Sequence, residues 1–173
     1  MRIRAATPAD AVPIAELHVR AWKSGYRGQV ADAYLDALTA DDLLPNLVWS
    51  LEHAPAEWRM WVAEDDGAII GFASTGPSTD ADARPSARIS ELFAIYVDPA
   101  RLGTGVGRGL LAHAVDDLRA RGAAAATLWV FGTNARARRF VEGAGWSEDG
   151  ATTIERIGEE HLATVRYRTT FAA

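Results

Sequence analysis

The stretch that decides the fold runs from Glu91 to Leu111 and reads ELFAIYVDPARLGTGVGRGLL. Its first part is rich in β-branched and aromatic residues and stops at Pro99, which predicts a strand over 89–97. Glycines at 103, 105 and 107 follow, and they leave the backbone N–H groups of the turn open to close approach. Because a helix starting here points its positive dipole end at the same place, the stretch predicts a binding site for a diphosphate.

The helix after the glycines is predicted from apolar residues at helical spacing, which are Val106, Leu110, Leu111, Ala114, Val115 and Leu118. Gly122 closes this helix as a C-cap. Two other glycine-rich phosphate sites do not match. A P-loop has Lys followed by Ser or Thr after its last glycine, where this chain has Arg108 and Gly109. The dinucleotide fingerprint G-x-G-x-x-G fails because its third glycine position also falls on Arg108.

A second block reads LWVFGTNARARRFVEGAGW from Leu128 to Trp146. Together the two blocks resemble the GNAT superfamily of N-acetyltransferases. The diphosphate signature of that family is Gln or Arg, two residues, Gly, one residue, then Gly or Ala; Gly105 and Gly107 fill its small positions, and Leu102 stands at the Gln or Arg position. The second family motif is matched by Asn134, Ala137, Phe140, Glu142, Gly145 and Trp146. The likeness covers most of the chain and is weakest over residues 22–58.

The resemblance implies an α/β (α+β) fold, with a mixed, mostly antiparallel central sheet of about seven strands flanked by helices on both faces. It also implies acetyl-CoA as co-substrate, held by the glycine turn and by the backbone of the preceding strand. The cofactor-binding residues expected on this basis are Ile95, Tyr96, Val97, Leu102, Gly103, Thr104, Gly105, Val106, Gly107, Arg108 and Asn134. Asn134 is also a residue type that caps helices, so both roles stay open for it.

Acetyl transfer to an amine requires that the ammonium lose a proton before it attacks the thioester. Glu91 is the candidate general base, because the resemblance implies a base at the start of this strand. Val141 stands where the family most often has a Tyr that protonates the departing thiolate. Candidates for the acid are therefore Tyr96, Tyr26 and solvent. Since a thiol pKa of roughly 8.5 is low, the thiolate can also leave without a dedicated acid.

The resemblance implies that the acceptor is a primary amine of a small molecule or a peptide. Trp22 and Tyr26 are the candidate substrate residues, in a segment that lines the acceptor side in related enzymes. Their spacing of four places both on one face of a helix. Bulky aromatic residues at helical spacing also form cores, so a packing role remains an alternative for both.

Composition sets limits on the class of protein. At 173 residues and 49% hydrophobic content, we expect one domain over 1–173. A net charge of −5 disfavours a nucleic-acid partner, and it either suits a cationic amine or simply solubilises the surface. The lack of cysteine excludes an acyl-thioester on the protein, so transfer would be direct, and four scattered histidines give no metal site. Without a long apolar run or a signal peptide, we expect no membrane contact and a cytoplasmic location.

Periodicity and turn residues predict this order of elements: strand 2–6, helix 8–25, a helical stretch 30–53, strands 58–64, 68–76 and 89–97, helix 104–121, strand 125–131, helix 134–143, and a strand pair 146–157 and 162–171. Asp65-Asp66-Gly67 predicts a tight hairpin turn. Residues 77–88 are the one segment of low hydrophobicity, and we expect them to be mobile.

Three alternatives to an amine acetyltransferase stay open. The first is an acyltransferase that uses another acyl-CoA or a hydroxyl acceptor. The second is an acyl-CoA sensor that binds but does not turn over, which the missing Tyr at Val141 motivates. The third is an interaction protein that uses the fold as a scaffold, for example as a homodimer through its C-terminal strands.

Overall fold

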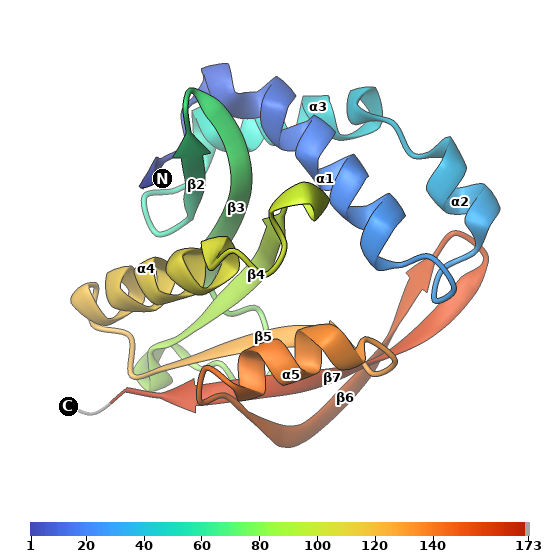
Figure 1. Cartoon of the computed structure of the whole chain (residues 1–173). Helices are drawn as coiled ribbons and strands as arrows, with labels where there is room; N and C mark the ends of the chain where they lie inside the picture. The colour runs from blue at the N-terminus through green and yellow to red at the C-terminus, as the bar shows by residue number, and fades with distance from the viewer. Residues whose placement is uncertain (172–173) are drawn as a thin grey trace.

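The computed structural model describes residues 1–171, in which seven strands form one sheet in the order β1-β2-β3-β4-β5-β7-β6 (Figure 1). The strands are β1 (Arg2–Ala5), β2 (Arg59–Asp65), β3 (Ala68–Pro77), β4 (Ile89–Val97), β5 (Ala125–Phe131), β6 (Ser147–Ile157) and β7 (Glu160–Thr170). All neighbouring strands are antiparallel except β4 and β5, which are parallel. The mixed, mostly antiparallel sheet expected from the sequence is therefore confirmed.

Helices cover both faces of this sheet (Figure 1). They are α1 (Ala11–Gly25), α2 (Asp32–Ala37), α3 (Ala40–His53), α4 (Val106–Ala120) and α5 (Ala135–Glu142). Neighbouring residues of β2 show the two layers, because alternate side chains of a strand point to opposite faces. Val62 packs with α1, and Ala63 lies in the larger core cluster that α4 and α5 share. Within residues 1–171, none of the helices is long and apolar enough to cross a membrane.

The observed elements differ from the predicted ones mainly at helix ends. The helical stretch 30–53 was wrong as a single element, because Leu38 and Thr39 are extended and separate α2 from α3. Thr39 then starts α3, since its backbone N–H and its hydroxyl both donate to the carboxylate of Asp42, at 2.9 and 2.6 Å. At the start of the chain, a 3-10 turn over Pro8–Asp10 precedes α1. The predicted hairpin turn is present, with Asp66 and Gly67 both at positive φ.

One irregularity of the sheet prepares the functional site. The parallel pairing of β4 with β5 covers three residue pairs, from Ile89–Ala125 to Glu91–Thr127, and then stops. On its other side β4 stays paired with β3, with a shift of register between Ser74 and Thr75. Beyond Glu91 the two parallel strands therefore separate, and a gap opens through the middle of the sheet.

Candidate active site

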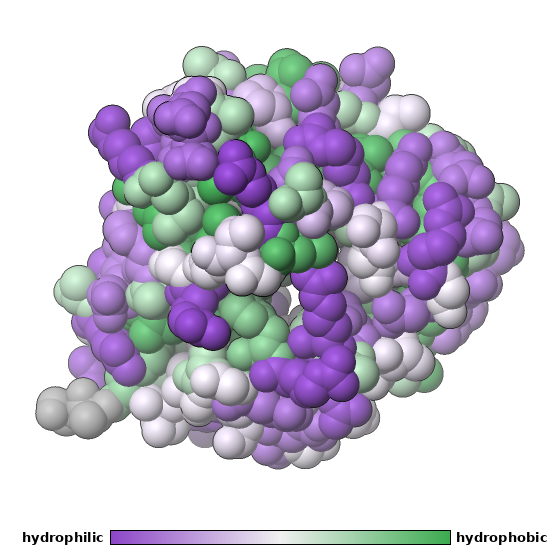
Figure 2. Space-filling view, in the orientation of Figure 1, coloured by the Kyte–Doolittle hydropathy of each residue, from purple (hydrophilic) through white to green (hydrophobic). Residues whose placement is uncertain are grey.

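A cavity of about 760 Å³ lies where β4 and β5 separate. It is lined by β4 and β5, by the glycine turn before α4, by the first turn of α5 and by the end of α1. The space-filling view shows a hollow near the middle of the molecule, with apolar side chains beside it and polar ones around its rim (Figure 2). The cavity thus joins the predicted diphosphate turn to the predicted acceptor side.

The glycine turn has the backbone expected of an anion site. Gly103 and Gly105 have φ of +79° and +94°, and a Cβ atom added at either would meet no other atom within 4 Å. Because Gly105 is left-handed, α4 begins at Val106 rather than at the predicted residue 104. The N–H groups of the first helical turn have no acceptor inside the helix, and those of α4 begin at the cavity wall. A diphosphate fits this turn, and a side chain at Gly105 would take its space.

Side chains around the turn divide into those that pack and those that face outward. The side chain of Val106 is buried in the core, so the residue can offer only its backbone N–H to a ligand. Thr104 uses its hydroxyl to bond the carbonyl oxygen of Arg101, at 2.6 Å, which tightens the turn. Leu102 and Arg108 are exposed and line the cavity. Leu102 presents an apolar side chain where the family signature has Gln or Arg, so it offers no side-chain hydrogen bond to an anion.

Charged side chains of both signs line the cavity. The basic residues, Arg101, Arg108 and Arg136, come from the 3-10 turn before the glycines, from α4 and from α5. The acidic residues, Glu91 and Glu155, come from β4 and β6. The arginines near the glycine turn favour an anion there.

The first turn of α5 forms a second wall. Asn134 caps α5, because its side-chain oxygen accepts from the N–H of Ala137 at 3.0 Å, and it also lines the cavity. Phe140 lies 3.6 Å from the position of a Cβ added at Gly107, so α4 and α5 approach closely here. Val141 is 2% exposed and belongs to the core. The place where the family most often has Tyr is therefore filled by packing.

Glu91 carries a buried carboxyl group and is the last residue of β4 that pairs with β5, with 7% of its surface exposed. The hydroxyl of Ser78 donates to its Oε2 at 3.2 Å. Burial raises the pKa of Glu91 above its usual value, and the nearby carboxylate of Asp80 raises the pKa further. A buried carboxyl group with a raised pKa that lines a cavity is a candidate for a general base.

Trp22, Tyr26 and Tyr96 form the aromatic wall between α1 and β4. The indole N–H of Trp22 donates to the hydroxyl of Tyr96 at 2.9 Å. The ring of Tyr26 makes edge contacts with Trp22 and with Phe131, at centroid distances of 4.8 and 5.2 Å. Burial raises the pKa of Tyr96 well above its usual value, so its hydroxyl keeps its proton at neutral pH. These aromatics pack together and also line the cavity, so the packing role is observed and the substrate role stays a prediction.

Several residues of the cavity have no separate signal in the sequence. Burial is the main cause that raises the pKa of Tyr26 and of Tyr96, and the nearby negative charge of Glu155 raises both pKa values further. Trp129 and Phe131 face the same space from β5. Alternation along β5 shows that these two side chains share a face, but it does not show which face bears the cavity. Glu155 lies far along the chain in a mostly exposed strand, so its place became visible only in the folded sheet.

Comparisons with known proteins agree with this geometry. Residues 12–146 match the family model described as Acetyltransferase (GNAT) family. A probable N-acetyltransferase of Mycobacterium tuberculosis is 32% identical over 174 residues, covering 97% of this chain and 92% of that protein. An aminoglycoside N(6')-acetyltransferase type 1 of Stenotrophomonas maltophilia is 37% identical over 112 residues, covering 64% of this chain and 62% of the relative.

Among solved structures, the PaiA N-acetyltransferase of Thermoplasma acidophilum in complex with coenzyme A superposes with a TM-score of 0.75. It is 19% identical, and the superposition covers 98% of each chain, which establishes the shared fold. Family model, full-length relative and fold all agree, and the chain belongs to the GNAT family of acetyltransferases.

Proposed function

We propose that the protein transfers an acetyl group directly from acetyl-CoA to a primary amine of a small molecule or a peptide. The observation that carries the proposal is one continuous cavity, which joins a glycine turn suited to a diphosphate with a buried carboxyl group, Glu91. The two ends meet through the gap between β4 and β5, so a thioester bound at one end faces an amine bound at the other.

The residues that would hold acetyl-CoA are those of the turn, of β4 and of Asn134. Backbone N–H groups from Gly103 to Arg108 would bind the diphosphate, with Arg108 and Arg136 adding positive charge. Unpaired backbone groups of β4 from Ile95 to Val97 would bond the pantetheine amides and the thioester carbonyl. When bound, acetyl-CoA supplies the activated acetyl group.

The protein's own contribution to the chemistry is to take up a proton and to place the amine. Glu91 in its ionised form would accept a proton from the ammonium, directly or through a water molecule. The neutral amine then attacks the thioester carbonyl, the C–S bond breaks and the thiolate leaves. The nitrogen gives up its second proton to water as the amide forms. A backbone N–H of β4 would stabilise the negative charge on the carbonyl oxygen. The thiolate would take its proton from solvent, because Val141 has none to give and Tyr96 holds its own tightly.

This assignment makes the hydroxyl of Tyr96 dispensable for the chemical step. We expect Tyr96→Phe to change kcat by no more than about threefold, because a thiol is a stronger acid than this tyrosine. The melting temperature should fall, since the indole N–H of Trp22 loses its acceptor. Steady-state kinetics with a good acceptor would measure kcat, and a loss of about a hundredfold would instead identify Tyr96 as the acid.

The acceptor proposed is a cationic amine. Glu91 and Glu155 supply negative charge on the acceptor side, and Trp22, Tyr26 and Phe131 supply aromatic faces. Carboxylates and aromatic rings both attract ammonium groups. The relative from Stenotrophomonas maltophilia is named for acetylation of an aminoglycoside, which agrees with this class of acceptor.

A second candidate function is an acyl-CoA sensor, favoured by one observation. Val141 is packed into the core where the family most often has Tyr, so that route for protonating the thiolate is missing. A sensor would bind acetyl-CoA through the same glycine turn and release no thiol with any amine.

The two functions are separated by one experiment on the purified full chain. Calorimetric titration with acetyl-CoA and with CoA measures binding, and thiol release against a panel of mono-, di- and polyamines then measures transfer. Because the chain has no cysteine, every thiol detected is released CoA. Binding with release supports the acetyltransferase, binding without release across the panel supports the sensor, and lack of binding refutes both.

A further inference from the structure

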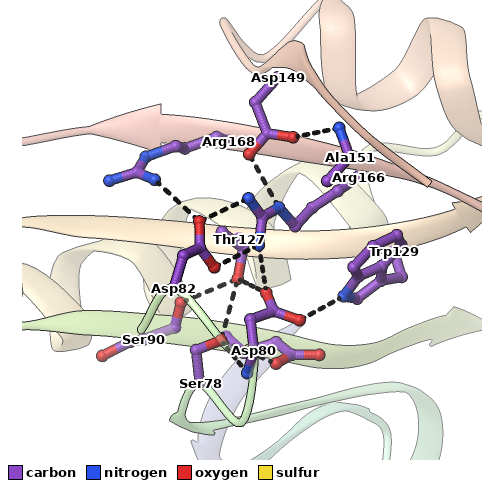
Figure 3. Close-up of polar contacts among 11 residues, drawn as sticks. Ser78, Asp80, Asp82, Ser90, Thr127, Trp129, Asp149, Ala151, Arg166 and Arg168 are labelled. Carbon is purple, nitrogen blue, oxygen red and sulfur yellow. Dashed lines mark hydrogen bonds and ion pairs between the residues drawn. The ribbon is translucent and has the colours of Figure 1, made fainter. Parts of the chain in front are cut away.

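A buried arginine of β7, Arg166, binds the segment after β3 that carries Asp80 and Asp82 (Figure 3). Arg166 of β7 is 8% exposed, and its guanidinium bonds three carboxylates. It contacts Asp82 through two bonds of 2.7 Å, Asp80 at 2.9 Å and Asp149 at 2.8 Å. Asp80 and Asp82 belong to the segment that composition predicts as mobile, and the ion pairs hold it against β7.

Asp80 does more than pair with Arg166. Its Oδ1 accepts the indole N–H of Trp129 at 3.1 Å, and its Oδ2 accepts the hydroxyl of Thr127 at 3.3 Å (Figure 3). Its backbone N–H donates to the hydroxyl oxygen of Ser78 at 3.2 Å. That bond occupies a lone pair of Ser78, whose own hydrogen is directed at Glu91.

We call Arg166 and its three carboxylates, Asp80, Asp82 and Asp149, the clamp. Asp80 connects this clamp to two parts of the candidate active site. One connection runs through Ser78 to Glu91, and the other fixes Trp129, which lines the cavity. Asp82 is the matched contrast within the same segment. It makes the shorter, two-bond contact with Arg166, is half exposed, and has no hydrogen bond to Ser78, Thr127, Trp129 or Glu91 among residues 1–171.

We propose that Asp80 is a positioning residue for Glu91: held by Arg166, it sets the hydroxyl of Ser78 on the carboxyl group and holds Trp129 at the cavity wall. The proposal rests on the proposed function, because it gives Glu91 its orientation as the base. It assigns Asp82 and Asp149 only to holding the clamp.

The charged and polar groups that face Glu91 make the proposal measurable. Asp80 from the loop raises the pKa of Glu91, while Ser78, the backbone N–H of Thr79 and Arg166 of β7 lower it. Asp80→Asn should therefore lower the pKa of Glu91, and Ser78→Ala should raise it. Asp82→Asn, which lacks contact with Glu91, should leave the pKa where it is.

The first measurement follows the carboxyl carbon of Glu91 by NMR during a pH titration of the free protein. It needs no acceptor and no turnover, so it tests the positioning even if the acetyltransferase proposal fails. Opposite shifts in Asp80→Asn and Ser78→Ala, with none in Asp82→Asn, are the result expected from the charge of Asp80 and the bond from Ser78. The positioning itself is tested by the double variant: Ser78→Ala should raise the pKa of Glu91 in the wild-type background and not in the Asp80→Asn background, because Asp80 no longer holds the Ser78 hydroxyl on the carboxyl group. An equal rise in both backgrounds would overturn the proposal.

The second measurement uses turnover with an active amine. Asp80→Asn should lower kcat roughly tenfold through loss of orientation, with the KM for acetyl-CoA unchanged and the acid limb of the rate profile moved to lower pH. Asp82→Asn should keep the wild-type pH profile. If Asp82→Asn reproduces the loss, the aspartates act only by holding the fold, and the proposal is wrong. The melting temperature of every variant shows whether the proteins being compared are folded.

Discussion

Gly105→Val is expected to weaken acetyl-CoA binding by at least about a hundredfold, or roughly 2.7 kcal/mol. The space next to Gly105 is open, and the structure places it at the N-terminus of α4 on the cavity wall. A valine there would fill the space that the diphosphate needs and would turn its methyl groups toward the N–H groups of the helix. Calorimetric titration with acetyl-CoA measures the loss.

Strain has to be separated from lost space, because Gly105 has φ of +94° and a left-handed β-branched residue costs about 1–2 kcal/mol. Gly122 offers the matched control at the opposite end of α4. It has φ of +83°, open space around a Cβ atom, and no place in the cavity lining. Gly122→Val should lose similar stability and keep its affinity. Equal affinity in Gly105→Val and the wild type would refute the diphosphate turn.

Glu91→Gln is expected to lower kcat by about a hundredfold near neutral pH, the usual effect of losing a general base. The amide keeps the size of the side chain and still accepts from Ser78, but it cannot take up a proton. As the pH approaches the pKa of the free amine, more acceptor arrives already neutral and the deficit should shrink. A deficit that is constant across pH would show that Glu91 only positions the substrate.

The direction of the pKa shift adds a second readout. The wild-type rate should fall as the pH drops through the raised pKa of Glu91, because the base becomes protonated. A raised pKa in the folded protein means that ionising Glu91 costs stability at all pH values above that pKa. Glu91→Gln should therefore melt at the same temperature as the wild type or higher at neutral pH. Low activity with undiminished stability would mark a residue kept for function.

Glu155 provides the comparison for that experiment. It is a carboxylate of the same cavity, but it is exposed and lies on β6. Glu155→Gln should raise the KM of a cationic amine while kcat changes little, because the residue attracts the substrate without taking its proton. The same loss of kcat in both variants would argue that neither carboxylate is a specific base.

Local signals were sufficient to predict the part of the fold that we propose binds the cofactor. The strand before Pro99, the glycines and the apolar repeat of α4 lie within one continuous stretch, so each supports the next. The turn at Asp66 and Gly67 was equally local, because both residues favour positive φ. The break at Leu38 was missed because it contains neither Gly nor Pro, and Thr39 resembles a residue inside a helix until its bond to Asp42 is seen.

The acceptor side depends on contacts between distant parts of the chain. Arg166 and Asp80 are 86 residues apart, and nothing in either neighbourhood points to the other. Composition predicts a mobile loop around Asp80. It does not show that Arg166 is buried and needs carboxylate partners, which the loop supplies through Asp80 and Asp82. Glu91 of β4 and Glu155 of β6 likewise line one cavity although they lie far apart in the chain.

The short pairing of β4 with β5 leaves an incomplete ladder in the middle of the protein. Beyond Glu91, every second backbone N–H and C=O of β4 points into the gap instead of toward a neighbouring strand. An extended molecule that carries amide groups can complete the ladder there and act as a temporary eighth strand. The amide hydrogens of Ile95 and Val97, which point into the gap, should then exchange with solvent quickly in the free protein and slowly once the gap is filled. The backbone itself would then report occupancy in variants that have lost all turnover.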